Sequence, residues 1–447
     1  MLDLKSAVLI AFLGVAPAIS QAQQADPFAP LVAQTLRSNG MLEAATHAEE
    51  RAAAQVREAR ALLLPRLNLE SRVSEQSGTL NLGDIVNPAF GALNQLTGSN
   101  RFPTNLDISL PRTHDSYFRI SVPIVNPAIW ANRSAANHRY DAQRFERLSV
   151  ARDLAARVQS AWLTARSAER AVGIREATLV LVQESQRVTT RLIDAGSATP
   201  DGLFRARAEV SEAEQQLIEA RDAASAALRS VNQLAGRPLD TALDDIPDSL
   251  LVRDIPIARE AALSLGVDRR EELAQLEAAG AAAGSAVRAA RGSFFPTIGV
   301  AVDYGFTGNT VSFSGKDDYV VASLVLSWNL FNGGGDVARI SGARATQEEL
   351  AARHRDLLEN VRLQVLQAYD AAVAGRSAIQ AADDQLESAR RAYNLIGRRY
   401  QEGQVPQIEL IDARSALTRA ELNRSVTLYR YAQRLVELER AAALRDL

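Results

Sequence analysis

The sequence predicts a mainly helical protein with a small β part, in which two tandem copies of one unit each carry a very long helical hairpin. Three observations predict it: a motif repeated at a spacing of 207 residues, two alternating strand patterns in each half, and long helical stretches without proline. Neither copy reads as a compact domain, so each needs partners to bury its apolar surface. The repeated positions are Gly196, Leu203, Ala206, Arg207, Ala213 and Glu214, which match Gly403, Leu410, Ala413, Arg414, Ala420 and Glu421.

The N-terminus predicts export. Lys5 precedes an apolar run over residues 7–15, and the small residues Ser20 and Ala22 suit cleavage by signal peptidase. We therefore expect residues 1–22 to be a signal peptide. No later stretch is apolar for 18 residues, so the mature chain would cross a membrane as strands or not at all.

In the first copy, a helix is expected over residues 29–63, ended by Pro65. The apolar period then changes from 3.6 to 2, which predicts strands over residues 66–73 and 118–124. The segment between these strands is rich in Gly, Asn and Pro and predicts a long loop.

The second copy repeats this order. A helix is expected over residues 256–291, followed by Pro296 and by strands over residues 298–306 and 320–330. The sequence therefore predicts four strands in each chain.

Each copy ends in a helical hairpin. Helical sequence without proline covers residues 129–194 and 336–402, and each stretch would be about 100 Å long at 1.5 Å per residue. In the second stretch, Leu386, Ala389, Tyr393, Ile396 and Tyr400 recur at the 3-4-3-4 spacing of a coiled-coil seam. Glycines then turn the chain into two return helices, expected over residues 200–234 and 406–443.

These patterns divide the chain into four parts. We expect a signal peptide at 1–22, a first structural repeat at 23–237 and a second at 257–447. The stretch 238–256 is rich in Pro and Asp, and we expect it to be a linker outside the helical wall, in an equatorial region at mid-height.

The predicted strands have one apolar and one polar face. Aromatic residues near both ends of these strands predict two girdles at the membrane interfaces. They are Tyr117, Phe118, Tyr304, Phe306 and Tyr319 at the loop ends, and Trp130, Phe294, Phe295, Trp328 and Phe331 at the helix ends. Four strands leave two unpaired edges, so a membrane barrel would have to be closed by oligomerisation, and three chains would supply 12 strands. A soluble α+β protein, whose aromatic residues pack strands on helices, is the alternative. The charged residues of the polar faces, which suit a water-filled lumen, are Arg66, Glu70, Arg72, Arg119 and Asp303.

Composition excludes other classes of protein. The 447 residues carry a formal charge of −3 and only two lysines, so no basic face indicates a nucleic acid as partner. The chain has no cysteine, and its four histidines are scattered without metal-ligand spacing. Gly333, Gly334 and Gly335 are not followed by the Lys-Ser/Thr of a phosphate loop. We expect no metal, no cofactor and no catalytic residue, and we do not expect an enzyme.

The chain resembles the TolC-like outer-membrane factors, the outer membrane efflux proteins that form trimeric tunnels in Gram-negative export. The resemblance covers about residues 27–443. It rests on the duplicated order of elements, the glycine-turn motif ending in Leu-x-x-Ala-Arg, and the junctions Pro-Ile-Val-Asn at 123–126 and Asn-Leu-Phe-Asn-Gly at 329–333. It implies a trimeric α-barrel with a long periplasmic extension, continued by a 12-stranded transmembrane β-barrel in outer-membrane lipid.

The implied function is that of a passive, gated exit tunnel of a tripartite efflux or type I secretion system. A periplasmic adaptor and an inner-membrane transporter, of the resistance-nodulation-division or ABC type, would open it. A periplasmic coiled-coil adaptor or tether without a channel is the rival reading, but it would not need four alternating strands. The cargo, whether drugs, metal ions or protein, stays open.

The resemblance also assigns residues at the periplasmic tip. Family members carry acidic aperture residues six and nine positions past the second glycine, here Glu409 and Asp412, and this spacing places both on one helix face. Three copies would form acidic rings that attract cations. Tyr400 and Asp201 would help to hold the tip closed, although Val405 stands where well-known members carry an arginine. The hairpin turns that would contact the adaptor contain Gly196, Leu203, Gly403 and Leu410.

Overall fold

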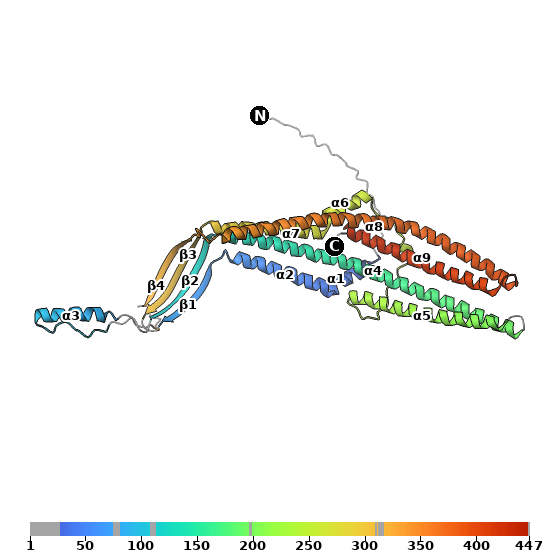
Figure 1. Cartoon of the computed structure of the whole chain (residues 1–447), viewed down its shortest axis with the longest axis horizontal. Helices are drawn as coiled ribbons and strands as arrows, with labels where there is room; N and C mark the ends of the chain where they lie inside the picture. The colour runs from blue at the N-terminus through green and yellow to red at the C-terminus, as the bar shows by residue number, and fades with distance from the viewer. Residues whose placement is uncertain are drawn as a thin grey trace, which may run out of the picture. The chain divides into compact units, whose positions relative to one another are not determined.

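A computed structural model describes residues 27–74, 81–107, 113–195, 199–308, 311 and 317–445. These residues form long helices and one four-stranded antiparallel sheet, which confirms the predicted fold class (Figure 1). The predicted signal peptide and Gly196 lie outside the described residues. The chain divides into two compact units, Met1–Ser38 with Val158–Arg253 and Asn39–Arg157 with Asp254–Leu447.

The first unit contains the first helical hairpin. It comprises α1 (Ala29–Ser38), the part of α4 (Pro127–Asp194) that follows Arg157, α5 (Pro200–Leu234) and the short η1 (Asp248–Leu250). The repeated positions Ala206 and Ala213 are both buried, since α5 packs through its small residues. The sequence motif therefore marks packing positions of the hairpin.

The root of this hairpin is fixed by an aromatic pair and a turn. Phe28 packs edge-on against Trp162 with ring centroids 5.3 Å apart, and both side chains are buried. Gly236 ends α5 with a positive φ of 63°, and the Ser38 hydroxyl donates to the Ala235 carbonyl at 2.8 Å. A Cβ atom at Gly236 would come within 2.7 Å of Ser38 Oγ, so glycine is required there on two grounds.

The second unit contains the sheet, with strand order β1-β2-β3-β4. Every neighbouring pair is antiparallel, and β2 carries an irregularity at Pro123 where its register with β3 shifts. In the described part of the chain β1 and β4 form the two edges of the sheet. The strands are β1 (Arg66–Ser74), β2 (Thr113–Val125), β3 (Thr297–Gly308) and β4 (Asp318–Ser327).

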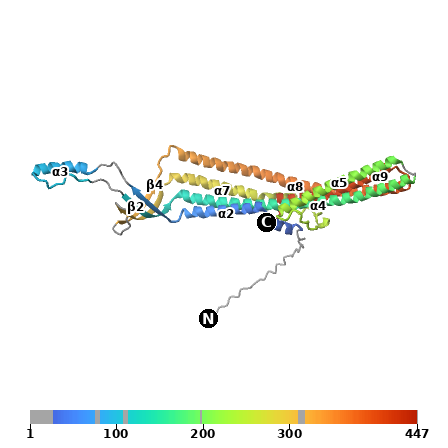
Figure 2. The same ribbon diagram turned by 90° about the horizontal axis from the view of Figure 1, so that it is seen from below.

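The second hairpin consists of α8 (Gly335–Gln401) and α9 (Gln407–Ala441), which run side by side in both views (Figures 1 and 2). The buried residues of α8 recur at spacings of 4 and 3 from Val361 to Ala382, as knobs-into-holes packing requires. The seam predicted from the sequence over residues 386–400 continues this rhythm with half-buried side chains, so that prediction is confirmed.

The helices that lead into the strands differ from the prediction, because both are interrupted. The helix expected over 29–63 is split at Asn39 into α1 and α2 (Gly40–Ala61), and Asn39 Oδ1 accepts the Met41 N–H at 2.9 Å as an N-cap. The helix expected over 256–291 is split at Arg270, whose backbone is extended. The breaks are 231 residues apart, like Pro65 and Pro296, so the interruption is part of the duplicated unit.

The second interrupted helix comprises α6 (Arg259–Arg269) and α7 (Glu271–Arg291), followed by the short η2 (Gly292–Phe294). α7 packs along α8 in the same unit. None of the described helices combines the length and the apolar character needed to cross a bilayer.

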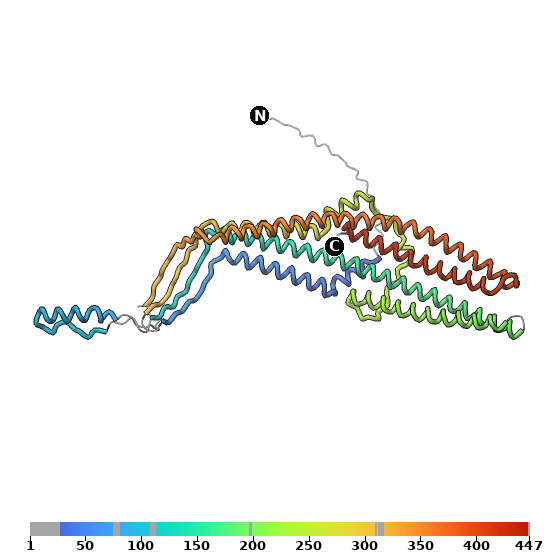
Figure 3. The backbone as a smooth tube through the Cα atoms, viewed as in Figure 1, coloured from blue at the N-terminus to red at the C-terminus, as the bar shows by residue number. Residues whose placement is uncertain are grey.

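The connection between the first two strands also differs from the prediction. Within the segment expected to be a turn-rich loop lies a helix, α3 (Gly83–Thr97), with an extended segment over residues 101–107 beside it (Figure 3). The asparagines and glycines that suggested turns instead lie on one face of this helix, where Asn87 and Asn94 bond the extended segment.

Candidate functional site: the two faces of the sheet and the hairpin tip

One face of the sheet is apolar and open. Leu67, Ile120, Val302 and Ala322 follow one another across the four strands in register, and their neighbours two residues away are also apolar. Isolated side chains of this kind need no explanation, but a continuous apolar sheet face does, because water does not stabilise it. The most exposed side chains on this face, between 63% and 74%, are Leu67, Leu69, Val320, Leu324 and Leu326.

The opposite face is polar, and it brings together three of the five predicted lumen residues. Arg119 donates from Nε and Nη2 to the two carboxylate oxygens of Asp303, at 2.8 Å each. Arg119 Nη1 also lies 3.8 Å from Glu70 Oε1, and Glu70 accepts the Tyr117 hydroxyl at 2.6 Å. The Arg119 guanidinium lies 4.8 Å from the centre of the Tyr117 ring.

The other two predicted lumen residues lie on the same polar face but outside this network. Arg72 is opposite Asp115 in the β1–β2 register, and Arg66 is opposite Ser121. Arg66 also lines a hollow at the helix end of the sheet, together with Thr297 and other residues. The sequence prediction grouped these residues by face correctly, but it could not pair them.

The predicted aromatic girdle at the loop ends of the strands is wrong for two of its residues. Tyr117 and Tyr319 lie on the polar face, where their hydroxyls donate to Glu70 and to Asp115, the latter at 2.9 Å. Strand alternation places them there, since each is an odd number of residues from an apolar-face neighbour. Tyr304 lies on the apolar face, with its ring edge-on to Phe306 at 5.6 Å.

The tip of the second hairpin is a glycine turn. Gly403 has a φ of 70°, its N–H donates to the Tyr400 carbonyl at 3.0 Å, and the Gln404 N–H donates to the Arg399 carbonyl at 2.8 Å. This pair of bonds is the Schellman motif, which places glycine just past the helix end. Tyr400 is half-buried in the last turn of α8.

The predicted aperture residues follow directly after this turn. Glu409 lies in the first turn of α9, one turn before Asp412, and both side chains are exposed. The positive end of the helix dipole favours a carboxylate at Glu409. Leu410 between them is half-buried.

The tip of the first hairpin belongs to the other compact unit. Asp201 lies at the second position of α5, where a hydrogen bond from the Thr199 hydroxyl and the nearby charge of Arg205 lower the pKa of its carboxyl. The ion pair with Arg205 spans 3.8 Å within the same helix. The arginine that pairs with Asp201 in this chain is therefore a helical neighbour, and Leu203 is half-buried beside it.

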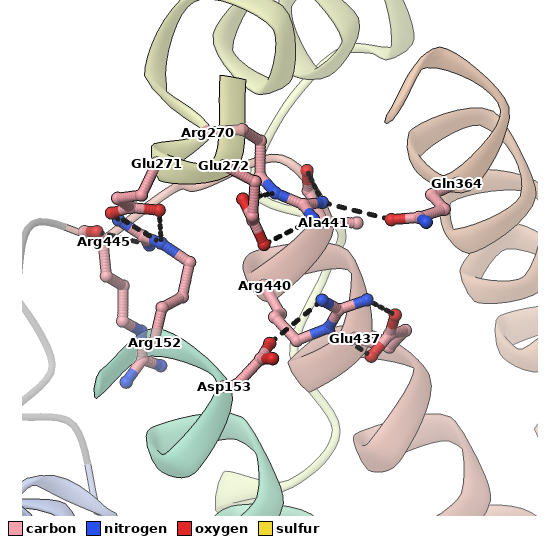
Figure 4. A network of polar contacts seen from close by, with 10 residues as sticks. All are labelled: Arg152, Asp153, Arg270, Glu271, Glu272, Gln364, Glu437, Arg440, Ala441 and Arg445. Atoms are coloured by element: carbon pink, nitrogen blue, oxygen red, sulfur yellow. Dashed lines mark hydrogen bonds and ion pairs between the residues drawn. The ribbon is translucent and has the colours of Figure 1, made fainter. Parts of the chain in front are cut away.

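Sequence reasoning missed a buried polar cluster in the second unit (Figure 4). Arg152 donates from Nε and Nη2 to the Glu271 carboxylate at 2.6–3.1 Å and from Nη1 to the Arg445 carbonyl at 2.8 Å. Both ion-paired side chains are only 10% exposed. This contact ties α4 of the first repeat to the start of α7 and to the C-terminal end of the chain.

Two further arginines complete this polar cluster. Arg270, at the helix break, donates to Glu272 at 2.8 and 2.9 Å and to the Ala441 carbonyl at 3.3 Å. Burial raises the pKa of Glu272, but the Arg270 guanidinium outweighs it and holds that pKa below its usual value. Arg440 bonds both Glu437 and Asp153, which raises its own pKa. The adjacent charges Arg270, Glu271 and Glu272 were the only sequence signal for this cluster.

The arrangement offers surfaces rather than a reaction centre. Among the described residues no group of His, Asp and Glu is placed to hold a metal ion. A sheet with one exposed apolar face and one polar face, joined to long helices, is typical of a channel component that spans a membrane.

Comparison with known proteins identifies the class. The family described as outer membrane efflux protein matches residues 31–237 and 262–444, and the chain belongs to this family. It is therefore a non-enzymatic outer-membrane channel of the kind that serves efflux and type I secretion, with a helical periplasmic portion. The rival reading of a periplasmic adaptor or tether is excluded.

Individual relatives agree with this assignment. The alkaline protease secretion protein AprF of Pseudomonas aeruginosa is 26% identical over 355 residues, which cover 77% of this chain and 73% of AprF. The pyoverdine export outer membrane protein OpmQ of Pseudomonas putida is 24% identical over 357 residues, covering 75% and 72%. The solved structures of CusC and of the outer-membrane channel OprN share the fold, with TM-scores of 0.79 and 0.78 at 21% and 19% identity. They cover 93% of this chain and 91% and 90% of their own chains.

Proposed function

We propose that three copies of this chain form a passive, gated tunnel in which 12 strands close one β-barrel in outer-membrane lipid. The observation that carries the proposal is the open apolar face of a sheet whose edge strands, β1 and β4, lack a neighbour in the described chain. In lipid, each backbone N–H and C=O of an edge needs a partner within the protein. Four strands cannot close on themselves, since transmembrane barrels begin at about eight strands.

The polar face of the sheet would then line the lumen. The Arg119–Asp303 pair and Glu70 lie together near the middle of the strands, and Arg66 and Arg72 lie toward either end of β1. In a water-filled barrel such a wall is solvated, and its charges tune ion selectivity without recognising cargo shape. This arrangement supports a conduit that makes and breaks no bond in its cargo.

At the periplasmic end we propose that Glu409 and Asp412 of three chains form two acidic rings around the aperture. Both are exposed one turn apart at the start of α9, as such rings require. Tyr400 and Asp201 would hold the closed state, and the turn regions with Gly196, Leu203, Gly403 and Leu410 would receive the adaptor. Docking of the adaptor and an inner-membrane transporter would open the tip.

The relatives of this chain serve different kinds of cargo. AprF is named for protease secretion and OpmQ for pyoverdine export, and both match this chain over similar lengths. We propose a transporter of the ABC or the resistance-nodulation-division type with its periplasmic adaptor. Chemical cross-linking in intact cells, followed by mass spectrometry of the captured proteins, distinguishes the two types.

The central test is mass and conductance. The mature chain is purified from outer membranes in detergent, its mass is measured by light scattering with correction for detergent, and its conductance is recorded in a planar bilayer. A trimer with small, cation-selective conductance supports the proposal. A monomer or dimer that never inserts would refute it.

Variants separate the aperture from the rest of the tunnel. Glu409→Gln with Asp412→Asn should reduce cation selectivity and raise the conductance, because both acidic rings are lost. Glu348→Gln, an exposed carboxylate far along α8 from the tip, is the matched control and should change neither. Tyr400→Phe with Asp201→Asn should make the closed tip leaky, and an unchanged single-channel conductance would contradict that role.

A further inference from the structure

We infer that the α3 hairpin, residues 81–107, packs against the same hairpin of neighbouring copies of this chain and forms a three-helix collar at the outer mouth of the channel. The inference rests on the proposed trimer and adds an interface that barrel closure does not require. α3 is inserted between β1 and β2, at the strand ends opposite those that join the long helices. In the proposed barrel these ends face the outside of the cell.

Two asparagine side chains hold α3 and the extended segment of the hairpin together. The Asn94 amide nitrogen donates to the Phe102 carbonyl at 2.7 Å, and the Phe102 N–H donates back to Asn94 Oδ1 at 3.0 Å. Asn87 forms the same two-bond contact with Leu106, at 2.8 Å for each bond. Each asparagine thus pairs with the backbone of the extended segment much as a neighbouring strand would.

Close packing supports the asparagine bonds. The rings of Phe90 and Phe102 lie 5.5 Å apart between the helix and the extended segment. A Cβ atom at Gly83 would lie 1.8 Å from the Leu106 carbonyl oxygen, so only glycine fits at this contact. These contacts fix which face of α3 turns toward its own chain, and they leave the opposite face available.

The opposite face carries the pattern of a helix–helix seam. Leu82, Ile85, Ala89, Ala92 and Leu96 follow one another at spacings of 3, 4, 3 and 4, as in the a and d positions of a coiled coil. Four of the five stand two residues from Asn87 or Asn94, which on a helix is about 200° around the axis. Ile85 is 64% exposed and Leu96 is 84% exposed, so the single chain leaves this seam uncovered.

The charge pattern favours a second copy over a lipid surface as the occupant. α3 contains no Lys or Arg, and its only charged residue is Asp84 in the first turn. A helix that lies on an anionic membrane surface carries basic residues beside its apolar face. A seam of leucine, isoleucine and two alanines is instead complementary to itself, because small residues at its centre let equivalent helices approach closely.

The short length of the seam fits a collar assembled on the barrel. Two heptads of a 15-residue helix are too few to associate from dilute solution. Barrel closure would hold three hairpins at one rim, and such tethering raises their effective concentration enough for a weak interface to form. The collar thus depends on the trimer, whereas the trimer does not depend on the collar.

Single cysteines test the collar directly, because the natural chain contains none. Leu96→Cys places a thiol in the seam, and Asp84→Cys places one on the same helix at an exposed position outside the seam. The full-length variants are oxidised with copper–phenanthroline in isolated outer membranes and analysed on non-reducing gels. The mass of each is measured in detergent by light scattering.

The expected result is that Leu96→Cys yields mainly disulfide-linked dimers, since two of three thiols at the axis can pair, while Asp84→Cys stays monomeric on the gel. Trimeric mass with equal, low cross-linking of both variants would overturn the collar and leave the proposed channel intact. A monomeric mass would overturn both proposals. A bimane label on Leu96→Cys that brominated phospholipid quenches in proteoliposomes would show a lipid occupant and also overturn the collar.

Discussion

Removing Arg152 from the buried polar cluster should destabilise the second unit more than any exposed ion pair could. The Arg152→Met substitution keeps most of the apolar stem but leaves the Glu271 carboxylate, 10% exposed, without its bidentate partner. It also removes the bond to the Arg445 carbonyl. Breaking a buried pair in this way costs about 3–5 kcal/mol, because a charge remains buried without compensation.

The magnitude converts into a shift of the melting midpoint. An unfolding entropy of about 2.1 cal/mol/K per residue over 447 residues gives about 1 °C for each kcal/mol, so we expect a drop of about 3–5 °C. The assay is thermal unfolding of the purified protein in detergent, followed by circular dichroism. The double variant Arg152→Met/Glu271→Met should recover most of the loss, since replacing both charges by apolar groups is often neutral.

A matched control uses an exposed pair of the same chemistry. Arg353 and Glu349 form an i,i+4 ion pair on α8 with side chains 64% and 55% exposed. Arg353→Met should cost at most about 1 kcal/mol, and so at most about 1 °C. If Arg152→Met lowers the midpoint no more than Arg353→Met does, the cluster does not hold the second unit together and the reasoning fails.

Three further predictions concern the sheet, the cluster and the tip. Leu324→Arg, on the apolar face, should cost about 2–4 kcal/mol of stability at mid-membrane and lower the amount of folded protein in outer membranes, whereas Val321→Arg, on the polar face, should be tolerated. Equal amounts of the two folded variants would contradict the assignment of faces. Because the folded-state pKa of Glu272 is depressed, its stabilising effect is present above about pH 4.5 and is lost as the pH falls further. The difference in melting midpoint between wild type and Glu272→Gln should therefore shrink on acidification, and a difference that is constant with pH would refute this. Gly403→Ala forces a side chain into the left-handed region at a cost of about 1 kcal/mol and should speed hydrogen exchange at the tip about fivefold, whereas Gly397→Ala in the α8 interior should not.

Much of the architecture could be predicted from local sequence patterns. The 3-4 rhythm of the second hairpin places residues from Val361 to Tyr400 on one seam because side-chain direction along a helix depends on spacing alone. The same logic assigns Arg119 and Leu324 to opposite faces of the sheet. A glycine at position 403 predicts the turn because few other residues adopt a positive φ without strain.

Contacts between residues far apart in sequence decided which polar groups pair. Arg119 and Asp303 are 184 residues apart in sequence, and only the β2–β3 register makes them partners. At the helix break, Arg270 donates to Gln364 and to the Ala441 carbonyl, which are 94 and 171 residues away in sequence, so no local propensity encodes these contacts.

The clearest case is α3. Asn87 and Asn94 favour turns when taken alone, because their side chains compete for nearby backbone groups. In the folded chain those side chains bond the backbone at Leu106 and Phe102, so the helix forms where the sequence indicated a loop. The sequence by itself determined the periodic elements and the sidedness of the strands, since both follow from spacing. The tertiary structure decided which polar groups meet, because a hydrogen bond needs both partners in place.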